Sequence, residues 1–429
     1  MLKAIRTACL VMLCLLFTAL ASAAPLRVAL VERQSTVEIS CDDDFLVRDA
    51  IMGSEVTMPK GKYFLHIQQG RLQLEEGSSF GSHIIIEALP EKELPKVNKK
   101  EYRGSLSAVI RNDRILLNNI IDIEDYLSCV LPEKTMPVWP DEAIKAQAVA
   151  ARSYALYMQA QNSSQDYDIS ANDEELVYRG CGKRIEKAAV TKLIRETQGQ
   201  YLADSYGRYL KGVSTSSTGG QTESALAAWN EAVSCLQSVK DYDQDSPEYK
   251  WQYLASPALL QNLLEQEGYK VGKLTAITLS PLGEKGDDRT ATGRVRYLFI
   301  SGSEGTVKIS GQRLADILDL NSTLFDVETG TPVPEVLKVP IENAYGFEIG
   351  SKDINIKVNG NDQPVWKNMM RSYHLLSGGK EEKITFKGHG RGHGVGLSAW
   401  GARGMANSDE SLTYADILRH YYPGARLIK

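Results

Sequence analysis

Several patterns that would assign a protein to a particular class are absent from this chain of 429 residues. Lys and Arg number 49, Asp and Glu number 54, and no long block carries charge of one sign. A nucleic-acid partner is therefore not expected. The six His are too few for a His-rich metal store. No repeat with a period of about 20–50 residues is evident, which argues against a repeat architecture.

Cysteine is also scarce. Beyond the N-terminal segment four cysteines remain, none of them in a Cys-x-x-Cys pair: Cys41, Cys129, Cys181 and Cys235. Four cysteines allow three pairings, between which the sequence does not choose. Without a Cys-x-x-Cys spacing, a zinc site made from these residues alone is not expected. Because a chain of this size does not need disulfides to hold a core, free buried cysteines are favoured.

Long apolar runs are missing except at the start of the chain. Lys3 and Arg6 precede the apolar run Ala8–Leu20, and Ala21–Ala24 and Pro25 follow it. This order predicts a signal peptide over residues 1–24, removed near Ala23 or Ala24, with an uncleaved anchor as the alternative. No later stretch approaches the ~18 apolar residues of a membrane span. The mature protein is predicted to be exported to the cell wall, the extracellular space or the periplasm.

The composition is that of a folded protein, since 43% of the residues are hydrophobic and 24% are charged. The length suggests two or three domains. Short β-rich runs separated by glycines predict an N-terminal β domain, and strands with short helices predict an inserted lobe. Residues 331–384 are predicted to be irregular. The expected fold class is α+β, a multi-lobed body divided at residues 25–100, 101–240, 241–340 and 341–429.

The clearest helix is predicted from Pro140 to Ala160. Pro140 suits its start, and Asp141 and Glu142 suit the dipole of its first turn. Spacings of four and three residues then give one apolar stripe, which consists of Ile144, Ala148, Ala151, Ala155 and Met158. Further helices are predicted over residues 185–198, 256–268 and 310–320.

Glu133 lies in the first of three segments that could carry chemistry. Three prolines and Trp139 predict a stiff, partly apolar loop over Val130–Pro140. A carboxyl group in apolar surroundings keeps its proton longer, as a general acid must. The alternative is a solvated loop residue.

The second segment, Gly388–Ser398, has glycine at five alternate positions and contains His389 and His393. The glycines allow close backbone approach. A phosphate cradle lacks its usual motif, and a metal site lacks a third nearby ligand. A Gly-rich loop that contains one functional His is favoured, and a purely structural turn is the alternative.

The third segment, Ser216–Glu223, places small hydroxylated residues around Gly219 and Gly220. It suits a loop that lines a polar cleft, with an ordinary polar turn as the alternative. A serine nucleophile is poorly supported here, because no Gly-x-Ser-x-Gly motif and no paired base are visible.

A series of motifs runs along nearly the whole mature chain. They are Ile123–Leu127, Trp139-Pro140, Ala143–Arg152, Val177–Gly180, Gly219–Glu223, Gly392–Ser398, Trp400–Ala402, Met405-Ala406 and Ile417–Gly424. In this order they resemble the SpoIID/LytB family, named after stage II sporulation protein D and the amidase enhancer.

The resemblance implies a peptidoglycan lytic transglycosylase with a cleft between lobes, whose acid is a Glu just before the helix led by Trp-Pro. Glu133 is the candidate here. Substrate-binding roles are predicted for Tyr126, Trp139, Gln147, Arg152, Tyr178, Ser216, Gly219, Gly220, Thr222, His393 and Ser398. Core packing is the alternative for the three aromatic residues, and a buried anchor is the alternative for Arg152. The implied partner is the glycan strand of peptidoglycan. The second hypothesis is a binding protein that grips peptidoglycan and activates a cell-wall amidase.

The chain departs from the family pattern at several positions. Lys134 stands five residues before Trp139, where the family has its Glu, and Glu133 is one residue earlier. Cys129 and Thr215 replace a Gly and a His, and Ala399 replaces a Gln. Some relatives hold zinc ahead of the Val-Tyr-x-Gly motif, where this chain has Ser170, Glu174 and Glu175. No metal and no cofactor are therefore predicted.

Overall fold

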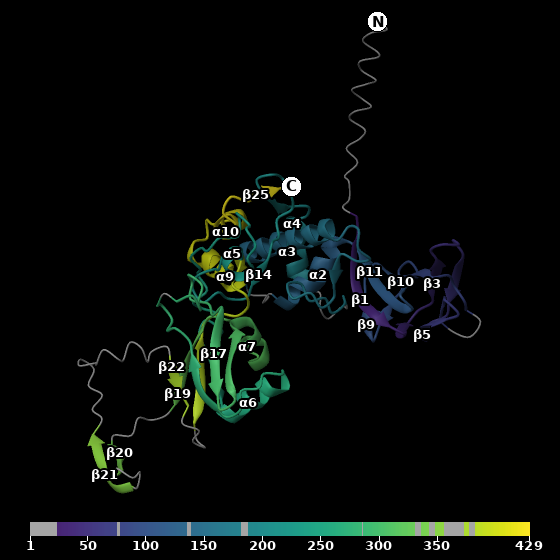
Figure 1. Cartoon of the computed structure of the whole chain (residues 1–429). Helices are drawn as coiled ribbons and strands as arrows, with labels where there is room; N and C mark the ends of the chain where they lie inside the picture. Colours follow the sequence, from purple (N-terminus) through teal and green to yellow (C-terminus); the bar gives the residue numbers. More distant parts are fainter. Residues whose placement is uncertain are drawn as a thin grey trace. The chain divides into compact units, whose positions relative to one another are not determined.

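The computed structural model describes residues 24–429 except 75–77, 135–138, 182–187, 285, 331–335, 343–347, 356–372 and 377–381. The chain forms two compact units (Figure 1). Unit 1 comprises Met1–Gly212 with Arg426–Lys429, and unit 2 comprises Val213–Ala425. Helices and several separate sheets occur together, which confirms the α+β class. Among the described residues no helix combines the length and the apolarity that a membrane crossing requires.

Two sheets form the β-rich part of unit 1. Their strand orders are β12-β1-β11-β10-β7-β3-β4 and β6-β5-β2-β8-β9. The bounds are β1 Leu26–Gln34, β2 Thr36–Cys41, β3 Phe45–Asp49, β4 Glu55–Met58, β5 Gly61–Gln68, β6 Arg71–Gln73, β7 His83–Ala88, β8 Lys96–Val97, β9 Lys100–Glu101, β10 Ser105–Arg111, β11 Arg114–Ile121 and β12 Ile169–Ser170. In β3, Phe45 and Val47 are buried while Leu46 and Arg48 are half-buried, the alternation of a strand with one face on a core.

Three helices complete unit 1, namely α2 Ile123–Lys134, α3 Asp141–Gln161 and α4 Ala188–Glu196. Pro140 is the N-cap of α3, as predicted, and the alanines of α3 are buried. Small side chains let neighbouring backbone come close: a Cβ on Gly212 would lie 2.3 Å from the carbonyl oxygen of Ala150. The short strand β13 (Tyr201–Ala203) pairs with β25 (Arg426–Ile428), so the last residues of the chain return to unit 1.

Unit 2 contains a lobe built on two sheets, with orders β15-β23-β19 and β18-β17-β16-β22. Its elements are β15 Trp251–Ala255, α6 Pro257–Gln266, β16 Leu274–Thr278, β17 Tyr297–Gly302, β18 Gly305–Ser310, α7 Gly311–Leu318, β19 Phe325–Gly330, β22 Tyr373–Leu375 and β23 Lys383–Gly388. Ser256 and Ser310 cap α6 and α7 through their side chains, which confirms both predicted helices. Buried apolar residues such as Leu260, Ile300 and Phe386 form the core of the lobe.

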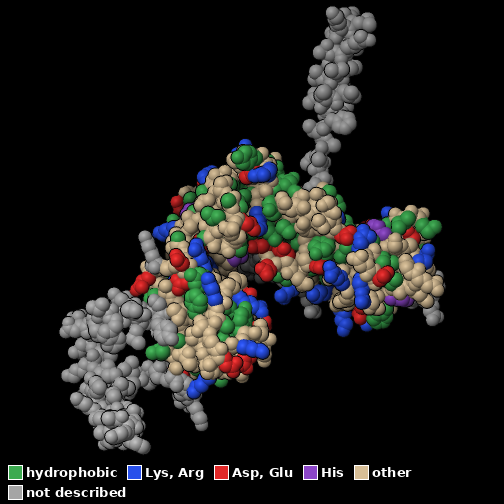
Figure 2. Space-filling view, in the orientation of Figure 1, with side chains coloured by type: hydrophobic (Ala, Val, Ile, Leu, Met, Phe, Trp, Pro, Cys, Tyr) green, Lys and Arg blue, Asp and Glu red, His purple; other side chains and the backbone are tan. Residues whose placement is uncertain are grey.

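The remaining elements of unit 2 are β14 Ser214–Thr215, α5 Ala225–Trp229, β20 Val336–Glu342, β21 Glu348–Asn355, β24 Leu397–Ser398, α9 Ala399–Ser408 and α10 Tyr414–Tyr421. The parallel pair β14–β24 joins segments 183 residues apart in the chain, with Ser214 opposite Leu397. On the face that Figure 2 shows, acidic and basic side chains are interspersed over the described surface. This mixture agrees with the nearly balanced composition.

Two sequence-based predictions about local structure are wrong. The segment from Val130 was predicted to be a loop, but residues up to Lys134 continue helix α2, with Pro132 inside its last turn. Residues 331–384 were predicted to be irregular, but they contain the hairpin β20–β21 and the strand β22. Prolines suggested a break in both places. In the second, β20 pairs with its chain neighbour β21, and β22 pairs with the distant strand β16, which the local composition did not indicate.

Candidate functional site

Helix α2 carries Glu133 in its last turn and is fixed at its other end by a cap and an ion pair. Oδ1 of Asp122 accepts the backbone N–H groups of Glu124 (2.8 Å) and Asp125 (3.4 Å). Two acidic residues in the first turn also suit the helix dipole. The side chains of Glu133 and Lys134 lie outside the described residues, as do residues 135–138.

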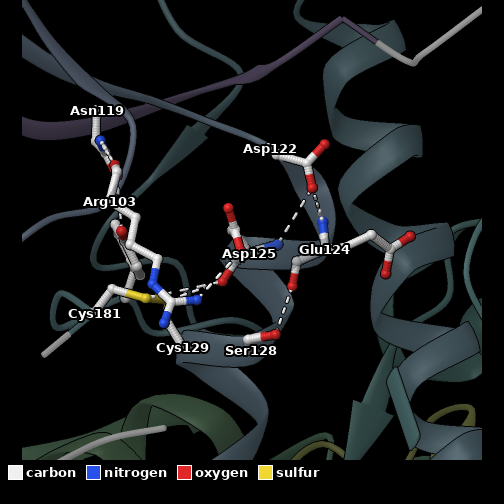
Figure 3. Close-up of a disulfide and its surroundings, with 9 residues drawn as sticks. Arg103, Asn119, Asp122, Glu124, Asp125, Ser128, Cys129 and Cys181 are labelled. Carbon is white, nitrogen blue, oxygen red and sulfur yellow. Dashed lines mark hydrogen bonds and ion pairs between the residues drawn. A yellow bond between two sulfur atoms is a disulfide. The ribbon is translucent and has the colours of Figure 1, made fainter. Parts of the chain in front are cut away.

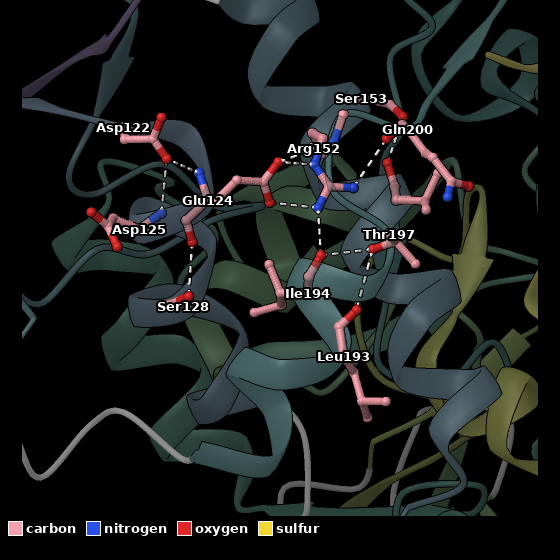
Figure 4. A network of polar contacts seen from close by, with 12 residues as sticks. Asp122, Glu124, Asp125, Ser128, Arg152, Ser153, Leu193, Ile194, Thr197 and Gln200 are labelled. Carbon is pink, nitrogen blue, oxygen red and sulfur yellow. Dashed lines mark hydrogen bonds and ion pairs between the residues drawn. The ribbon is translucent and has the colours of Figure 1, made fainter. Parts of the chain in front are cut away.

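A buried guanidinium group connects the three helices of unit 1 (Figure 4). Nε and Nη2 of Arg152, on α3, donate to the two carboxylate oxygens of Glu124 on α2, at 2.8 and 2.6 Å. Arg152 also donates to the carbonyl oxygens of Ile194 in α4 (3.2 Å) and of Gln200 beyond it (3.0 Å). The Arg152 side chain is 1% exposed. Arg152 therefore sets the relative positions of α2, α3 and α4.

A disulfide fixes the middle of α2 (Figure 3). Cys129 is bonded to Cys181, 52 residues further along the chain. The expectation of free cysteines is therefore wrong for this pair, while Cys41 and Cys235 are free and buried. The sequence offered three pairings with no spacing to choose between them, and only the fold brings Cys129 and Cys181 together.

In unit 2 the second and third predicted segments lie side by side. Ser217 pairs with Arg391, and Glu223 pairs with Val395, as isolated β-bridges. The Thr215 hydroxyl donates to the carbonyl oxygen of Arg391 at 2.9 Å. We call residues 213–223 together with residues 388–398 the two-motif core.

The alternate glycines make the two-motif core possible. A Cβ at Gly390 would lie 2.6 Å from the carbonyl oxygen of Ser217, and one at Gly396 would lie 2.2 Å from that of Val213. Four of the five glycines also adopt positive φ, Gly390, Gly392, Gly394 and Gly396. Side chains at these positions would separate the two segments, so the spacing has a packing cause.

Two buried acidic residues, Asp241 and Asp243, hydrogen-bond to the two-motif core. Oδ2 of Asp243 accepts the Ser217 hydroxyl (2.5 Å) and the N–H groups of Thr218 (2.7 Å) and Gly219 (2.8 Å). Asp241 accepts the Thr218 hydroxyl and the Tyr421 hydroxyl, each at 2.5 Å. Burial, and then the charge of Asp243, raise the pKa of Asp241 above its ordinary value.

Arg294 is the cationic counterpart of these acids. It is 3% exposed and donates to the carbonyl oxygens of Thr218 and Gly392, each at 3.2 Å. Burial lowers its pKa to about 10, against the opposite effect of Glu223 and Asp243. Arg294 comes from the inserted lobe, so it ties the lobe to both motifs.

A groove of about 860 Å³ opens beside the two-motif core. It is lined by Gly219, Gly220, Gln221, Leu282, Gly283, Glu284, Gly286, Asp287, Arg289, Thr290, Ala291, Thr292, Gly293, Leu324 and His389. The lining combines carboxylates, hydroxyls, an amide, an imidazole and the guanidinium of Arg289, which is paired with Asp326, and five glycines leave the backbone open. Burial lowers the pKa of His389, so its ring favours the neutral form. Such a lining suits a neutral ligand rich in hydroxyl and amide groups.

All five residues of unit 1 for which substrate contacts were predicted are buried in its core. Tyr126 is 0% exposed and donates to the carbonyl oxygen of Leu176, and Tyr178 donates to Oδ1 of Asn119 at 2.7 Å. Trp139 and Gln147 are each 5% exposed. With Arg152, these side chains hold the helices and offer almost no surface to a sugar.

Of the residues of unit 2 that were predicted to bind substrate, some line the groove and others are buried in packing. Gly219 and Gly220 line the groove. Thr222 and Ser398 are 0% exposed, and the Ser398 side chain caps α9 by accepting the N–H of Gly401. Ser216 is half-buried and its carbonyl oxygen accepts the N–H of Trp400. Thr222 and Ser398 therefore act in packing.

His393 is held by backbone through both ring nitrogens. Its Nδ1 accepts the N–H of Val395 at 3.0 Å, so its Nε2 carries the proton and donates to the carbonyl oxygen of Ser214 at 3.1 Å. Its half-buried ring lies 5.0 Å from that of Trp229. This geometry fixes one tautomer and suits a supporting ring better than a proton carrier.

Sequence reasoning missed Asp241, Asp243 and Arg294. The two acids lie in the charged run Lys240–Asp245, which has the composition of a solvated loop. Arg294 lies in the lobe without a recognisable motif. No local signal marks these residues, because their burial depends on segments far away in the sequence.

The comparisons with known proteins support the resemblance to the SpoIID family. A family model described as Stage II sporulation protein (SpoIID) matches residues 111–203. An uncharacterized protein of Brachyspira hyodysenteriae is 29% identical over 77% of this chain and 73% of its own length. The amidase enhancer of Bacillus subtilis is 27% identical over 91% of this chain and 52% of its own length. Stage II sporulation protein D of the same species is 26% identical over 72% of this chain and 74% of its own length. The chain thus spans about half of the amidase enhancer.

Removing the buried guanidinium should destabilise unit 1. Arg152→Ala leaves the Glu124 carboxylate buried without its partner, and we expect a loss of about 3–5 kcal/mol in the free energy of unfolding. Unfolding in urea, monitored through the hydrogen exchange of peptides from unit 1, measures this loss. The matched control is Arg208→Ala, whose side chain is 75% exposed in its pair with Asp204. We expect the control to change stability by less than about 0.5 kcal/mol, and equal effects of the two variants would contradict the anchoring role.

Gly394→Ala should destabilise unit 2 more than Gly268→Ala does. Both glycines have positive φ, 79° and 86°, but only a Cβ at Gly394 meets another group, Nη2 of Arg294 at 2.1 Å. The shared backbone cost is about 1–2 kcal/mol, and the displaced guanidinium should add about 1–3 kcal/mol. Urea unfolding of unit 2 gives both values, and equal losses would exclude the packing cause.

The raised pKa of Asp241 predicts a pH-dependent stability. A carboxyl group with a raised pKa in the folded state stabilises the fold below its ordinary pKa of 3.8, and this contribution is lost as pH rises through the folded value. The wild type should therefore gain stability relative to Asp241→Asn as pH falls from about 7 to about 4. Urea unfolding of both proteins across this range measures the difference, and a constant difference would refute the assigned direction.

Proposed function

Because the chain belongs to the SpoIID/LytB family, we propose that it is an exported lytic transglycosylase with Glu133 as its general acid and base. Its substrate would be the glycan strand of peptidoglycan. The bond cleaved would be the glycosidic bond from N-acetylmuramic acid to N-acetylglucosamine. The product would carry a 1,6-anhydro end on the muramic acid.

The observation that carries this proposal is the placement of Glu133 within the family segment. Residues 111–203, which match the family model, contain α2, α3 and α4. Glu133 lies at the end of α2, ahead of the Trp139-Pro140 start of α3. The acid candidate thus stands on a helix anchored by Arg152 and by a disulfide. Anchoring of this kind favours catalysis, because an acid must be held in a fixed position relative to the bond it protonates.

One carboxyl group is sufficient for this reaction. The protonated Glu133 donates its proton to the glycosidic oxygen as the bond breaks and positive charge develops on the sugar ring. The resulting carboxylate then accepts the proton of the C6 hydroxyl, whose oxygen closes the anhydro ring. No water attacks, so the second carboxylate of hydrolases is not required.

The groove of unit 2 supports glycan binding in this proposal. Sugar hydroxyls can donate to Glu284 and Asp287 and can exchange hydrogen bonds with Thr290. Acetamido groups can approach the backbone closely at Gly219 and Gly220, where no side chain intervenes, although the N–H of Gly219 is already bonded to Asp243. These are the group types that the substrate presents.

An amidase-activating role is the second candidate, favoured by one comparison. The relative named amidase enhancer aligns with 91% of this chain. In that role the protein would grip peptidoglycan and activate a separate cell-wall amidase, and Lys134 at the position of the family Glu would be compatible with weak cleavage.

Glu133→Gln should abolish glycan cleavage while the protein still binds glycan. Gln keeps the shape of Glu and has no titratable proton, so we expect a rate loss of about 10²–10⁴-fold. The substrate is glycan freed of stem peptides, and mass spectrometry of anhydro-ended products measures the rate. Co-sedimentation with insoluble peptidoglycan measures binding.

The matched control for this experiment is the neighbouring residue. Lys134→Ala should change the rate modestly, through loss of a nearby cation that lowers the pKa of an acid. Equal rates in the wild type and in Glu133→Gln would remove Glu133 as the acid. A wild type that binds peptidoglycan and stimulates an amidase without forming anhydro ends would establish the second candidate instead.

A further inference from the structure

We propose that the Cys129–Cys181 disulfide is the device that positions Glu133, so that full glycan cleavage requires the oxidised pair. The inference rests on the proposed function, because it assigns a positioning role around the proposed acid. It concerns only residues of unit 1, and it gives the disulfide a role beyond general stability.

The disulfide lies one helical turn before Glu133. Residues 129 and 133 are four apart on α2, so their Cα positions lie on the same side of the helix. The Cys129 and Cys181 residues are 2% and 3% exposed, and their Cα atoms lie 5.0 Å apart. Figure 3 shows the disulfide between Cys129 on α2 and Cys181.

The turn that carries Glu133 needs such a tie, because Pro132 interrupts the helix next to it. Proline has no N–H, so the hydrogen bond from residue 132 to the carbonyl oxygen of Ser128 cannot form. The first turns of α2 are held by Asp122 and by the ion pair of Glu124 with Arg152. Those contacts lie nine or more residues before Glu133, whereas Cys129 lies four residues, about one turn, before it.

The other end of the disulfide is fixed to the backbone of unit 1. The N–H of Cys181 donates to the carbonyl oxygen of Glu101 in β9 at 2.7 Å. Gly180, with φ of 99°, passes so close that a Cβ there would lie 2.6 Å from the same oxygen. Tyr178 is buried and bonds Asn119. The disulfide therefore couples α2 to a segment that cannot shift easily.

The other contacts between α2 and this region lie further from Glu133 than the disulfide does. Tyr126 donates to the carbonyl oxygen of Leu176, and its ring centroid lies 5.2 Å from that of Tyr178. Arg103 forms an ion pair with Asp125 at 3.2 Å, and the two side chains are 26% and 43% exposed (Figure 3). Exposed pairs of this kind contribute little to stability. Loss of the disulfide should therefore loosen the last turn of α2 and leave the buried helix contacts in place.

Reduction provides the direct test. Two electrons and two protons convert the disulfide into the thiols of Cys129 and Cys181, and dithiothreitol supplies them as it closes to its cyclic disulfide. The background is Cys41→Ala/Cys235→Ala, so that no free thiol confuses the result. In this background the experiment compares oxidised protein, reduced protein and the added pair Cys129→Ala/Cys181→Ala.

We expect reduction to lower kcat about 10- to 100-fold, since a displacement of about 1 Å can cost 10²-fold. KM should change less than about twofold, because glycan binding does not depend on the acid. Reoxidation with oxidised glutathione should restore kcat, and the double variant should match the reduced protein. Hydrogen exchange of a peptide covering residues 123–134 should increase on reduction, while the peptides of α3 keep their protection.

Two results would overturn the proposal. Unchanged kcat with unchanged exchange in residues 123–134 would mean that the disulfide does not position the last turn. Loss of protection throughout unit 1 would mean that it holds the fold as a whole. Failure of the proposed function gives a different result, in which Glu133→Gln keeps its activity while exchange at the end of α2 still responds to reduction.

Discussion

The arrangement of unit 1 depends on one buried guanidinium group. Arg152 joins α2, α3 and α4 through the carboxylate of Glu124 and two carbonyl oxygens, and it is the largest fully buried side chain of the described structure. A buried charge is unfavourable unless it is paired and fully hydrogen-bonded. In any other arrangement of the three helices, Arg152 would lose hydrogen-bond partners, and the free-energy cost of burying its charge would no longer be offset. Helix α2, whose last turn contains Glu133, carries both this ion pair and the disulfide.

Unit 2 reaches a comparable constraint by close backbone packing. Its alternate glycines let residues 388–398 lie against residues 213–223, and Arg294 and Asp243 bond the backbone where the two meet. Many polar side chains of these motifs form hydrogen bonds within the protein, such as those of Thr215, Ser217 and Thr218. What remains open to ligand is the glycine backbone at the groove and the side chains that the lobe adds.

Each unit, taken by itself, has one feature on which the proposed function draws. In unit 1 the last turn of α2 carries the candidate acid, and in unit 2 the groove is lined by carboxylates, hydroxyls and glycine backbone. The same parts would serve a protein that binds peptidoglycan without cutting it. The difference between the two functions then depends on a single carboxyl group and on what holds it in place.

The sequence by itself determined the elements whose signals are local. Capping serines, the Pro140 start and the alanine stripe placed α3, α6 and α7, and the serial motifs were enough to predict the family. It also singled out Glu133 and the glycine segments. It did not determine which motif residues face a ligand, because Tyr126, Thr222 and Ser398 look equally suited to substrate and to core. The pairing of Cys129 with Cys181, the continuation of α2 through Pro132 and the burial of Asp243 with Arg294 were decided only by the tertiary structure. Each depends on contacts between residues far apart in the chain, and local spacing carries no information about such contacts.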